Sequence, residues 1–318
     1  MDRIFFVLLL LSAIFFAALS FQPAENAPLT SEDLGRLLFN DPLLSSDQSI
    51  SCASCHIPAF AFSDTSAVSL GVGGQKGARN TPAATNMSAR SAFFWDGRAG
   101  TLEDQVLQPV ENPVEMNLPL PAAIGRLRNS ARYRGFFKAI YGREPDTTTL
   151  ADALASFVRT LETSDTPFDR WMQGNETAMS ASAIRGRRVF MTKGKCFDCH
   201  FSPDFTGDEF RNIGLYDGKT LTDPGRFGVT KDSSDLGKFK VPGLRNVAVT
   251  GPYMHDGSYR TLREVIDYYD QPDKFVTHSF NRDPLLANPL GLSEAEKQDL
   301  EAFLQALTDD RFVKGNGR

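Results

Sequence analysis

The sequence is poor in the two residue types that most often bind metals or form crosslinks. It contains four cysteines and four histidines in 318 residues, and every cysteine lies in one of two short motifs. Neither motif has the further cysteine or histidine close by that a structural zinc site would require. Basic residues are not in excess either, because the formal net charge is −5. The composition gives no electrostatic basis for binding nucleic acid, and we expect no such partner.

Long apolar segments are missing after the first twenty residues. An apolar run extends from Ile4 to Leu19, and residues 18–20 supply a small-x-small cleavage site. The run is short for a membrane-spanning helix, and no second run of that length follows. We predict that residues 1–20 are a signal peptide and that the protein is exported without stable membrane insertion. An uncleaved anchor is the alternative, because Asp2 weakens the usual positive charge before the run. The absence of a cysteine near the cleavage site disfavours a lipoprotein.

The four cysteines form two copies of one motif, each followed by a histidine. The copies are Cys52-Ala-Ser-Cys55-His56 and Cys196-Phe-Asp-Cys199-His200. C-x-x-C-H is the signature of covalent c-type haem attachment, in which two thiols add to the haem vinyl groups and the adjacent imidazole reaches the iron. A disulfide across each pair, as in thioredoxin-like motifs, is the alternative, but the histidine after both copies argues against it. We predict two covalent haem c groups with His56 and His200 as axial ligands. Bacterial haem attachment of this kind occurs outside the cytoplasmic membrane, so we expect a periplasmic protein.

The mature chain of about 300 residues is long for a single hydrophobic core. Each half contains one motif, and the polar stretch from Asp165 to Ser182 is the candidate boundary. We therefore predict domains at 21–165 and 166–318.

Helical patterns dominate both halves. Helices are predicted after Thr30, over Ala151–Leu161, and after Ser293, where Glu296 completes a capping box. Gly- and Pro-rich stretches at 71–82, 109–121 and 201–243 predict long ordered loops. Loops of this length are unusual in compact domains unless they have a function, and wrapping a haem is such a function.

Further short motifs extend over nearly the whole mature chain. They are Ser51–His56, Gly77–Pro82, Phe94–Arg98, Leu102–Gln105, Pro113–Met116, Cys196–His200, Val241–Asn246 and Gly251–Gly257. With these segments the chain resembles the bacterial dihaem cytochrome c peroxidases, the broad family that includes MauG. The resemblance implies a mainly α fold of two cytochrome c-like domains, each wrapped around one haem. It also implies that hydrogen peroxide reacts at the N-terminal haem and that the C-terminal haem relays electrons.

The resemblance implies three catalytic residues around the first haem. Glu115 matches the family's catalytic glutamate, which moves a proton between the two oxygens of bound peroxide. Gln105 matches the amide that orients peroxide, and Trp95 matches a tryptophan between the haems that can carry an electron. A solvated surface charge is the alternative for Glu115, and a core aromatic is the alternative for Trp95.

Two further features concern the metal ligands at and between the haems. Many family members close the first haem with a second histidine, but this sequence has Val72 there and no histidine between His56 and His200. The first haem is therefore expected to rest open, without reductive activation, although Val72 could equally be a packing residue. The resemblance also implies calcium bound by the Asn80 side chain and by two backbone carbonyls, those of Thr250 and Pro252. An ordinary turn is the alternative for Asn80.

The second haem differs from that of a plain peroxidase. The family's usual sixth ligand is a methionine, and the matching position here is Tyr269, as in MauG and its closest relatives. A phenolate favours oxidised iron, so this ligand suits the storage of an oxidising equivalent. A buried core tyrosine is the alternative, because Tyr269 shares a helical face with Leu262, Val265 and Ile266. Met254 is a weaker candidate ligand.

Three functions follow from this set of residues. The first is a peroxidase that takes electrons from a small cytochrome or cupredoxin. The second is a MauG-like oxidase that uses peroxide to oxidise a Trp or Tyr of a partner protein. The third is a dihaem electron carrier without catalysis, which Glu115 and Gln105 disfavour. Tyr269 favours the second function over the first.

Overall fold

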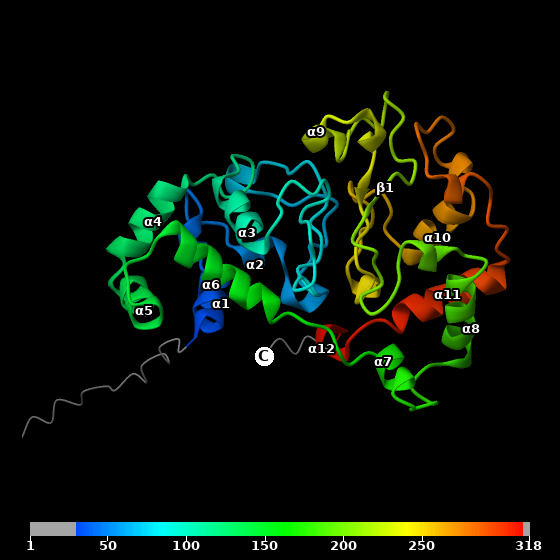
Figure 1. The fold of residues 1–318 in the computed structure, drawn as a ribbon, viewed down its shortest axis with the longest axis horizontal. Helices are drawn as coiled ribbons and strands as arrows, with labels where there is room; N and C mark the ends of the chain where they lie inside the picture. The colour runs from blue at the N-terminus through cyan, green and yellow to red at the C-terminus, as the bar shows by residue number, and fades with distance from the viewer. Residues whose placement is uncertain (1–29, 314–318) are drawn as a thin grey trace, which may run out of the picture.

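The computed structural model describes residues 30–313. They form two lobes that lie side by side, one from the N-terminal half of the chain and one from most of the C-terminal half (Figure 1). The predicted signal peptide, residues 1–20, lies outside the described residues. No helix within residues 30–313 is long and apolar enough to cross a membrane.

The first lobe consists mainly of α-helices joined by long loops. They are α1 (Ser31–Asn40), α2 (Cys52–Cys55), α3 (Leu102–Glu111), α4 (Leu120–Asn129), α5 (Ala131–Tyr141) and α6 (Thr147–Arg159). Helix α1 begins where the sequence predicts, because the Thr30 hydroxyl accepts a hydrogen bond from the Asp33 amide. Helix α6 begins ahead of the predicted start at Ala151, because Asp146 and Thr149 form a capping box there.

The second lobe has a similar helical framework and one small sheet. Its helices are α7 (Pro167–Met172), α8 (Ala181–Met191), α9 (Phe227–Thr230), α10 (Leu262–Asp270) and α11 (Glu294–Gln305). Strands β1 (Phe210–Arg211) and β2 (Phe239–Lys240) pair antiparallel. Helix α11 begins with the predicted capping box of Ser293 and Glu296. A final short helix, α12 (Asp310–Val313), follows. Short 3-10 helices occupy Pro42–Leu44, Pro58–Phe60, Val72–Gly74, Cys196–Asp198, Ser233–Asp235, Val247–Val249, Pro272–Lys274 and Pro284–Leu286.

One glycine in each lobe allows two long helices to cross in close contact. In the first lobe, a Cβ at Gly35 of α1 would overlap the backbone carbonyl of Ala153 in α6. In the second lobe, a Cβ at Gly186 of α8 would overlap the backbone carbonyl of Asp299 in α11. These two crossings form the centre of each lobe's framework, and larger residues would force the helices apart.

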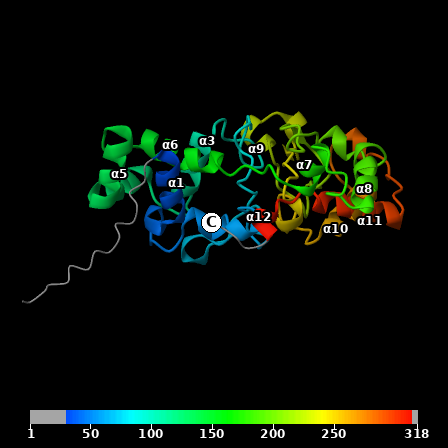
Figure 2. The ribbon, with the colours of Figure 1, turned by 90° about the horizontal axis from the view of Figure 1, so that it is seen from below.

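The hydrophobic residues gather in separate clusters. The first lobe's cluster extends from Leu34 to Val158, and the main cluster of the second lobe extends from Phe168 to Leu307. The exception is Phe312 of α12, which belongs to the first cluster and packs against Phe62 with ring centroids 6.1 Å apart. The end of the described chain therefore returns to the first lobe, and Figure 2 shows α12 between the two lobes. The domain boundary at Asp165 stays a prediction.

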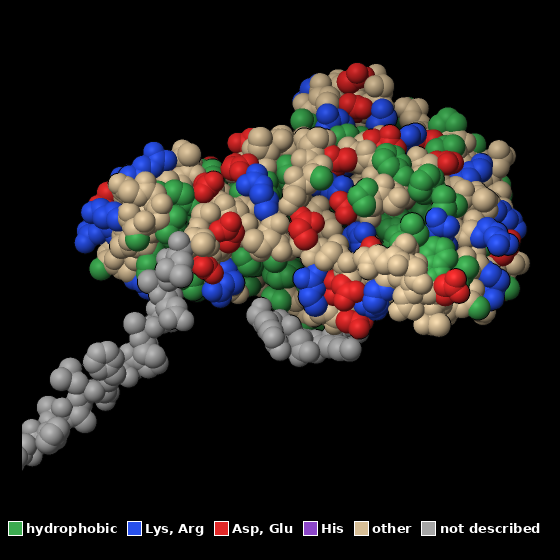
Figure 3. Space-filling view, turned by 60° about the horizontal axis from the view of Figure 1, so that its bottom comes forward, with side chains coloured by type: hydrophobic (Ala, Val, Ile, Leu, Met, Phe, Trp, Pro, Cys, Tyr) green, Lys and Arg blue, Asp and Glu red, His purple; other side chains and the backbone are tan. Residues whose placement is uncertain are grey.

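The predicted long loops are present with one correction. The stretch 201–243 contains little regular structure beyond α9, two short strands and a 3-10 turn. The loop predicted for 109–121 is shorter, because α3 continues through Pro109 to Glu111 and α4 begins at Leu120. A proline this close to the helix end interrupts little of the hydrogen-bond ladder, so it does not stop the helix. On the face shown in Figure 3, acidic and basic side chains are interspersed.

Candidate haem sites

Each C-x-x-C-H motif lines a cavity of its own. The first cavity has a volume of about 780 Å³ and is lined by Cys52, Cys55 and His56. The second has a volume of about 230 Å³ and is lined by Cys196, Cys199 and His200. Both cavities have mainly apolar walls of the kind that suits a large planar cofactor.

The two motif histidines are held in the same way. Nδ1 of His56 is 2.8 Å from the carbonyl oxygen of Phe62, and Nδ1 of His200 is 2.9 Å from the carbonyl oxygen of Phe205. A carbonyl can only accept, so Nδ1 must carry the proton in both rings. Burial lowers the pKa of both imidazoles, which keeps them neutral. Each Nε2 therefore keeps a free lone pair, which is the state required of an axial haem ligand.

The four cysteines are free thiols and form no disulfide. Burial raises the pKa of Cys52 and of Cys196 to about 12, and that of Cys199 to about 11. The thiols therefore stay neutral in the cavity walls. Free thiols with an adjacent, correctly protonated imidazole are the donor set that covalent haem attachment needs, so the residues of both sites fit this cofactor.

Glu115 and Gln105 both line the first cavity. Glu115 lies in the loop after α3, where its Oε1 accepts a 2.6 Å hydrogen bond from Nδ2 of Asn112. Burial raises the pKa of Glu115, while the Asn112 hydrogen bond and the charge of Arg98 act in the opposite direction. The net shift is upward, as expected for a carboxyl that exchanges protons near neutral pH.

Val72 does not line the first cavity, whereas its neighbours Leu70 and Gly71 do. The Val72 side chain is buried elsewhere, and its amide donates a 2.8 Å hydrogen bond to the backbone carbonyl of Glu115. The segment thus supports the loop of Glu115. Among the described residues that line this cavity, His56 is the only histidine.

Trp95 lines both cavities, so it lies in the wall between them. Its indole Nε1 donates a 2.8 Å hydrogen bond to the backbone carbonyl of Asn80, which lines both cavities as well. Nδ2 of Asn80 points to the carbonyls of Ser66 and Ala67 at 3.3 Å. The other two predicted calcium ligands, Thr250 and Pro252, line the second cavity.

Tyr269 lines the second cavity together with Leu262, Val265 and Ile266. The predicted helical face therefore borders the cavity, while Leu262 and Ile266 also belong to the hydrophobic core of this lobe. The role of Tyr269 as an iron ligand stays a prediction. Burial, with a contribution from Tyr268, raises the pKa of Tyr269. Met254 lines the same cavity, so both candidate sixth ligands border the second site.

The sequence analysis missed a buried charge cluster between the two sites. Arg79 donates hydrogen bonds of 2.7 and 2.8 Å to Asp223, and one of 2.6 Å to Asp96. His255 stacks on Phe239 with ring centroids 3.7 Å apart, and its Nε2 is 3.9 Å from Asp223. Arg79 lines the first cavity and His255 the second. Arg79 and Asp96 belong to motifs already noted, and buried charges require partners, so their pairing could have been suspected.

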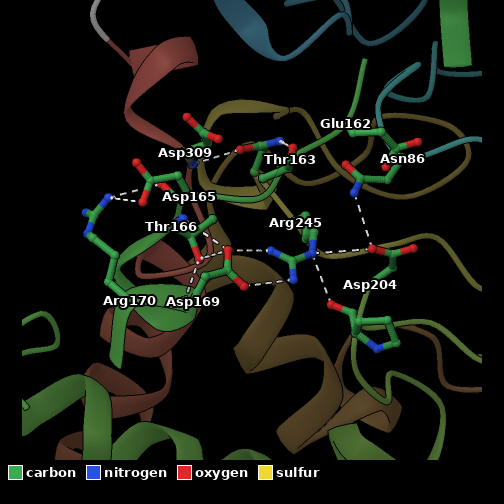
Figure 4. A network of polar contacts seen from close by, with 12 residues as sticks. Asn86, Glu162, Thr163, Asp165, Thr166, Asp169, Arg170, Asp204, Arg245 and Asp309 are labelled. Atoms are coloured by element: carbon green, nitrogen blue, oxygen red, sulfur yellow. Dashed lines mark hydrogen bonds and ion pairs between the residues drawn. The ribbon is translucent and has the colours of Figure 1, made fainter. Parts of the chain in front are cut away.

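A second polar network joins the lobes near the His200 loop (Figure 4). Arg245 donates to both carboxylate oxygens of Asp169 at 2.8 and 2.9 Å, and to the carbonyl of Pro203 at 3.0 Å. From the first lobe, Asn86 donates to Asp204 at 3.2 Å. Asp204 directly precedes Phe205, whose carbonyl orients His200. The network therefore connects the lobe interface to the second site.

The geometry defines a protein with two C-x-x-C-H sites, each lining its own cavity, and an aromatic side chain between them. A family model described as di-haem cytochrome c peroxidase matches residues 30–177. The methylamine utilization protein MauG of Methylorubrum extorquens is 39% identical over 290 residues, which cover 90% of this chain and 80% of that protein. Cytochrome c551 peroxidase of Nitrosomonas europaea is 34% identical, covering 90% of this chain and 82% of that protein.

A solved structure of a MauG-like protein associated with microbial copper homeostasis superposes with a TM-score of 0.82. It is 33% identical, and the match covers 90% of this chain and 92% of that one. The chain belongs to the di-haem cytochrome c peroxidase family. It is an oxidoreductase of the kind that uses peroxide as oxidant.

Proposed function

We propose that the protein reduces hydrogen peroxide at the first site with electrons that pass through the second, and that it belongs to the tyrosine-ligated, MauG-like branch. The observation that supports this best is Tyr269 in the wall of the second cavity, with Trp95 between the two cavities. Haem bound at each motif would supply the iron centre for peroxide and a second redox centre. The remaining steps are assigned to side chains of this chain.

Glu115 is the proposed proton shuttle. Asn112 holds its Oε1, which leaves Oε2 to take a proton from one peroxide oxygen and return it to the other. The raised pKa favours this exchange, because the protonated and ionised forms then differ less in free energy near neutral pH. The Gln105 amide orients the peroxide beside this carboxyl.

Trp95 is the proposed electron bridge between the sites. Its indole N–H donates to a peptide carbonyl, which is not a base. Trp95 therefore keeps its proton while an electron passes, so transfer between the sites needs no proton acceptor within the wall.

Tyr269 is the side chain that would bind the iron of a haem held at the second motif. Burial makes an isolated phenolate unfavourable at this position, as the raised pKa of Tyr269 indicates. A bound cation reverses that preference, because it offsets the buried negative charge. The pocket thus suits a phenolate that coordinates ferric iron. Met254 is the alternative ligand.

Calcium between the sites and export to the periplasm complete the proposal. Asn80, Thr250 and Pro252 offer neutral oxygens, which suit calcium, and all three border the second cavity. The partner is either a protein oxidised at Trp or Tyr or a small electron-donor protein. The Tyr269 ligand favours the first.

The test is the reaction of the fully oxidised protein with peroxide. The wild type should react without prior reduction, and the optical spectra of both haems should change. Tyr269→Met should raise the reduction potential of the second haem in spectroelectrochemical titration, because methionine stabilises ferrous iron better than phenolate does. If the oxidised protein does not react with peroxide, but reduces peroxide rapidly when reduced cytochrome c is supplied, the protein is an ordinary cytochrome c peroxidase. An unchanged potential in Tyr269→Met would make Tyr269 a wall residue only.

A further inference from the structure

A chain of tyrosines leads away from the second cavity. Tyr269 lines the cavity, and the ring of its neighbour Tyr268 lies 5.7 Å from it, centroid to centroid. The ring of Tyr259 follows at 5.5 Å from Tyr268. These separations are those of rings in direct contact, roughly 4.5–7 Å.

The environment of the three tyrosines changes from interior to surface. Tyr268 is completely buried in a small cluster with Leu215 and Val276, and its hydroxyl donates a 2.6 Å hydrogen bond to the carbonyl of Ile213. Tyr259 is only partly buried. Beyond it, Phe275 packs against both Tyr259 and Tyr268 at 5.8 and 5.7 Å, and 46% of Phe275 is exposed.

Ring packing alone does not require tyrosine at these positions, although the Tyr268 hydroxyl also bonds to the Ile213 carbonyl. The buried aromatic residues of the main cluster in this lobe are phenylalanines, namely Phe168, Phe190, Phe205 and Phe303. Phenol rings are far easier to oxidise than benzene rings. A continuous line of phenols from a redox site to the surface is therefore suited to electron transfer.

We propose that Tyr268 and Tyr259 form an electron relay from the surface to the second site, with Tyr259 as its outermost oxidisable residue. The inference rests on the proposed function, and it adds the place at which the electron donor is oxidised. The expected donor carries an accessible phenol or indole group, either as a small molecule or as a side chain of a partner protein.

The relay supplies the electrons and protons that the reduction of peroxide consumes. Reduction of one hydrogen peroxide to two waters consumes two electrons and two protons. In each of two passes, Tyr259 gives one electron inward through Tyr268 and Tyr269, and releases its phenolic proton. The resulting neutral radical then takes one electron and one proton from the donor's phenol or indole. The two protons released by Tyr259 match the two consumed at the first site.

Tyr268 and Tyr259 differ in how they can lose a proton. Tyr268 bonds to a carbonyl, which cannot accept its proton, so Tyr268 acts as a bridge. Burial raises the pKa of Tyr259 to about 12, and the nearby carboxylates of Asp256 and Glu264 add to this shift. Tyr259 is partly exposed, so solvent can receive the proton when the ring is oxidised. Tyr259 is therefore the place where an oxidised ring becomes a neutral radical.

The experiment uses the intact dihaem protein treated with peroxide in the absence of a donor. A nitroso spin trap captures radicals, and peptide mass spectrometry locates the adduct. We expect the adduct on Tyr259 in the wild type, and at least a fivefold lower yield there in Tyr268→Phe. In Tyr259→Phe the adduct should be lost from this segment, and the tyrosyl signal in electron paramagnetic resonance should fall.

One variant serves as a control. Tyr216→Phe removes a partly buried tyrosine of the same lobe that packs on Phe280 instead of on the relay. It should not change the yield of adduct on Tyr259. An adduct on Tyr253 or Tyr216 with Tyr259 unmarked, while peroxide still oxidises both haems, would overturn the relay alone. Absence of any reaction with peroxide would overturn both the relay and the proposed function.

Discussion

At the scale of single residues, the structure assigns different tasks to side chains that look alike in the sequence. Tyr268 and Tyr269 are consecutive, yet one is locked in a core cluster and the other borders the second cavity. Likewise Val72 and Leu70 are two residues apart, and only Leu70 borders the first cavity. The direction of each side chain, more than its type, decides its part in the chemistry.

Glu115 provides the first prediction at this scale. Glu115→Gln keeps the size of the side chain and the possible hydrogen bond to Asn112, but it removes the carboxyl that we propose as the proton shuttle. We expect the reaction with peroxide to slow by roughly 10²–10⁴-fold in stopped-flow measurements, the usual contribution of a general acid–base group. The pyridine haemochrome assay should still find two haems per chain. Asp104→Asn, on the exposed side of α3, is the matched control. A peroxide rate equal to that of the wild type in Glu115→Gln would assign the shuttle to another group.

At the scale of helices, each lobe depends on one crossing at which two helices lie too close for any side chain larger than glycine. Gly186 of α8 meets the backbone of α11 at Asp299 and the Cβ of Phe303. Phe303 belongs to the cluster that also contains Phe205, whose carbonyl holds His200. A change in this helix crossing is therefore transmitted toward the second site.

Gly186→Ala is expected to destabilise the second lobe. The added methyl group must separate α8 from α11, and overpacking of this kind costs about 1–3 kcal/mol. Gly135→Ala in α5 is the control, because a Cβ there meets nothing within 4 Å. That control should instead stabilise its helix by about 0.5–1 kcal/mol. Thermal unfolding followed by circular dichroism measures both, and a Tm for Gly186→Ala at or above that of the wild type would contradict the close crossing.

At the scale of the whole molecule, a buried ion pair supports the polar network in which Asn86 of the first lobe contacts Asp204 of the second. Arg245 is almost fully buried and bonds to Asp169, to the Pro203 carbonyl and, at 3.3 Å, to Asp204. Burial raises the pKa of Asp169, but the hydrogen bonds from Arg245 and Thr166 outweigh it, so the pKa is lowered overall. The folded protein thus favours the ionised carboxylate.

Arg245→Met should therefore destabilise the protein in a pH-dependent manner. Loss of one partner of a buried pair costs about 3–5 kcal/mol, because the other charge stays buried without compensation. Since the folded pKa of Asp169 is lowered, its ionic contribution is present above the ordinary carboxyl range and is lost as the pH falls through the lowered value. The difference in denaturant midpoint between wild type and variant should be large at pH 7 and shrink in acid. Arg170→Met is the control, since Arg170 pairs with the exposed Asp165. A difference that does not depend on pH would contradict the role of Asp169.

The sequence could predict what depends on neighbouring residues. The helix starts at Thr30 and Ser293 follow local capping rules, and each C-x-x-C-H motif keeps its thiols and imidazole together. The resemblance to a known family predicted that Glu115, Gln105, Trp95 and Tyr269 would border the cavities. It could not predict contacts between residues far apart in the chain, such as Arg79 with Asp223 or Gly186 with Asp299. The first contact depends on how the two lobes meet and the second on how α8 crosses α11, and local patterns encode neither.

Because α12 returns to the first lobe, the packing around the first site is completed late in the synthesis of the chain. Phe312 packs against the ring of Phe62, and the carbonyl of Phe62 holds the imidazole of His56. The first motif leaves the ribosome early, but the residue that braces its histidine loop is among the last of the described chain. A nascent or truncated chain could therefore carry a complete C-x-x-C-H sequence around His56 and still lack the support for its axial ligand. The first site, where we propose that peroxide reacts, is finished only when the second lobe has been made.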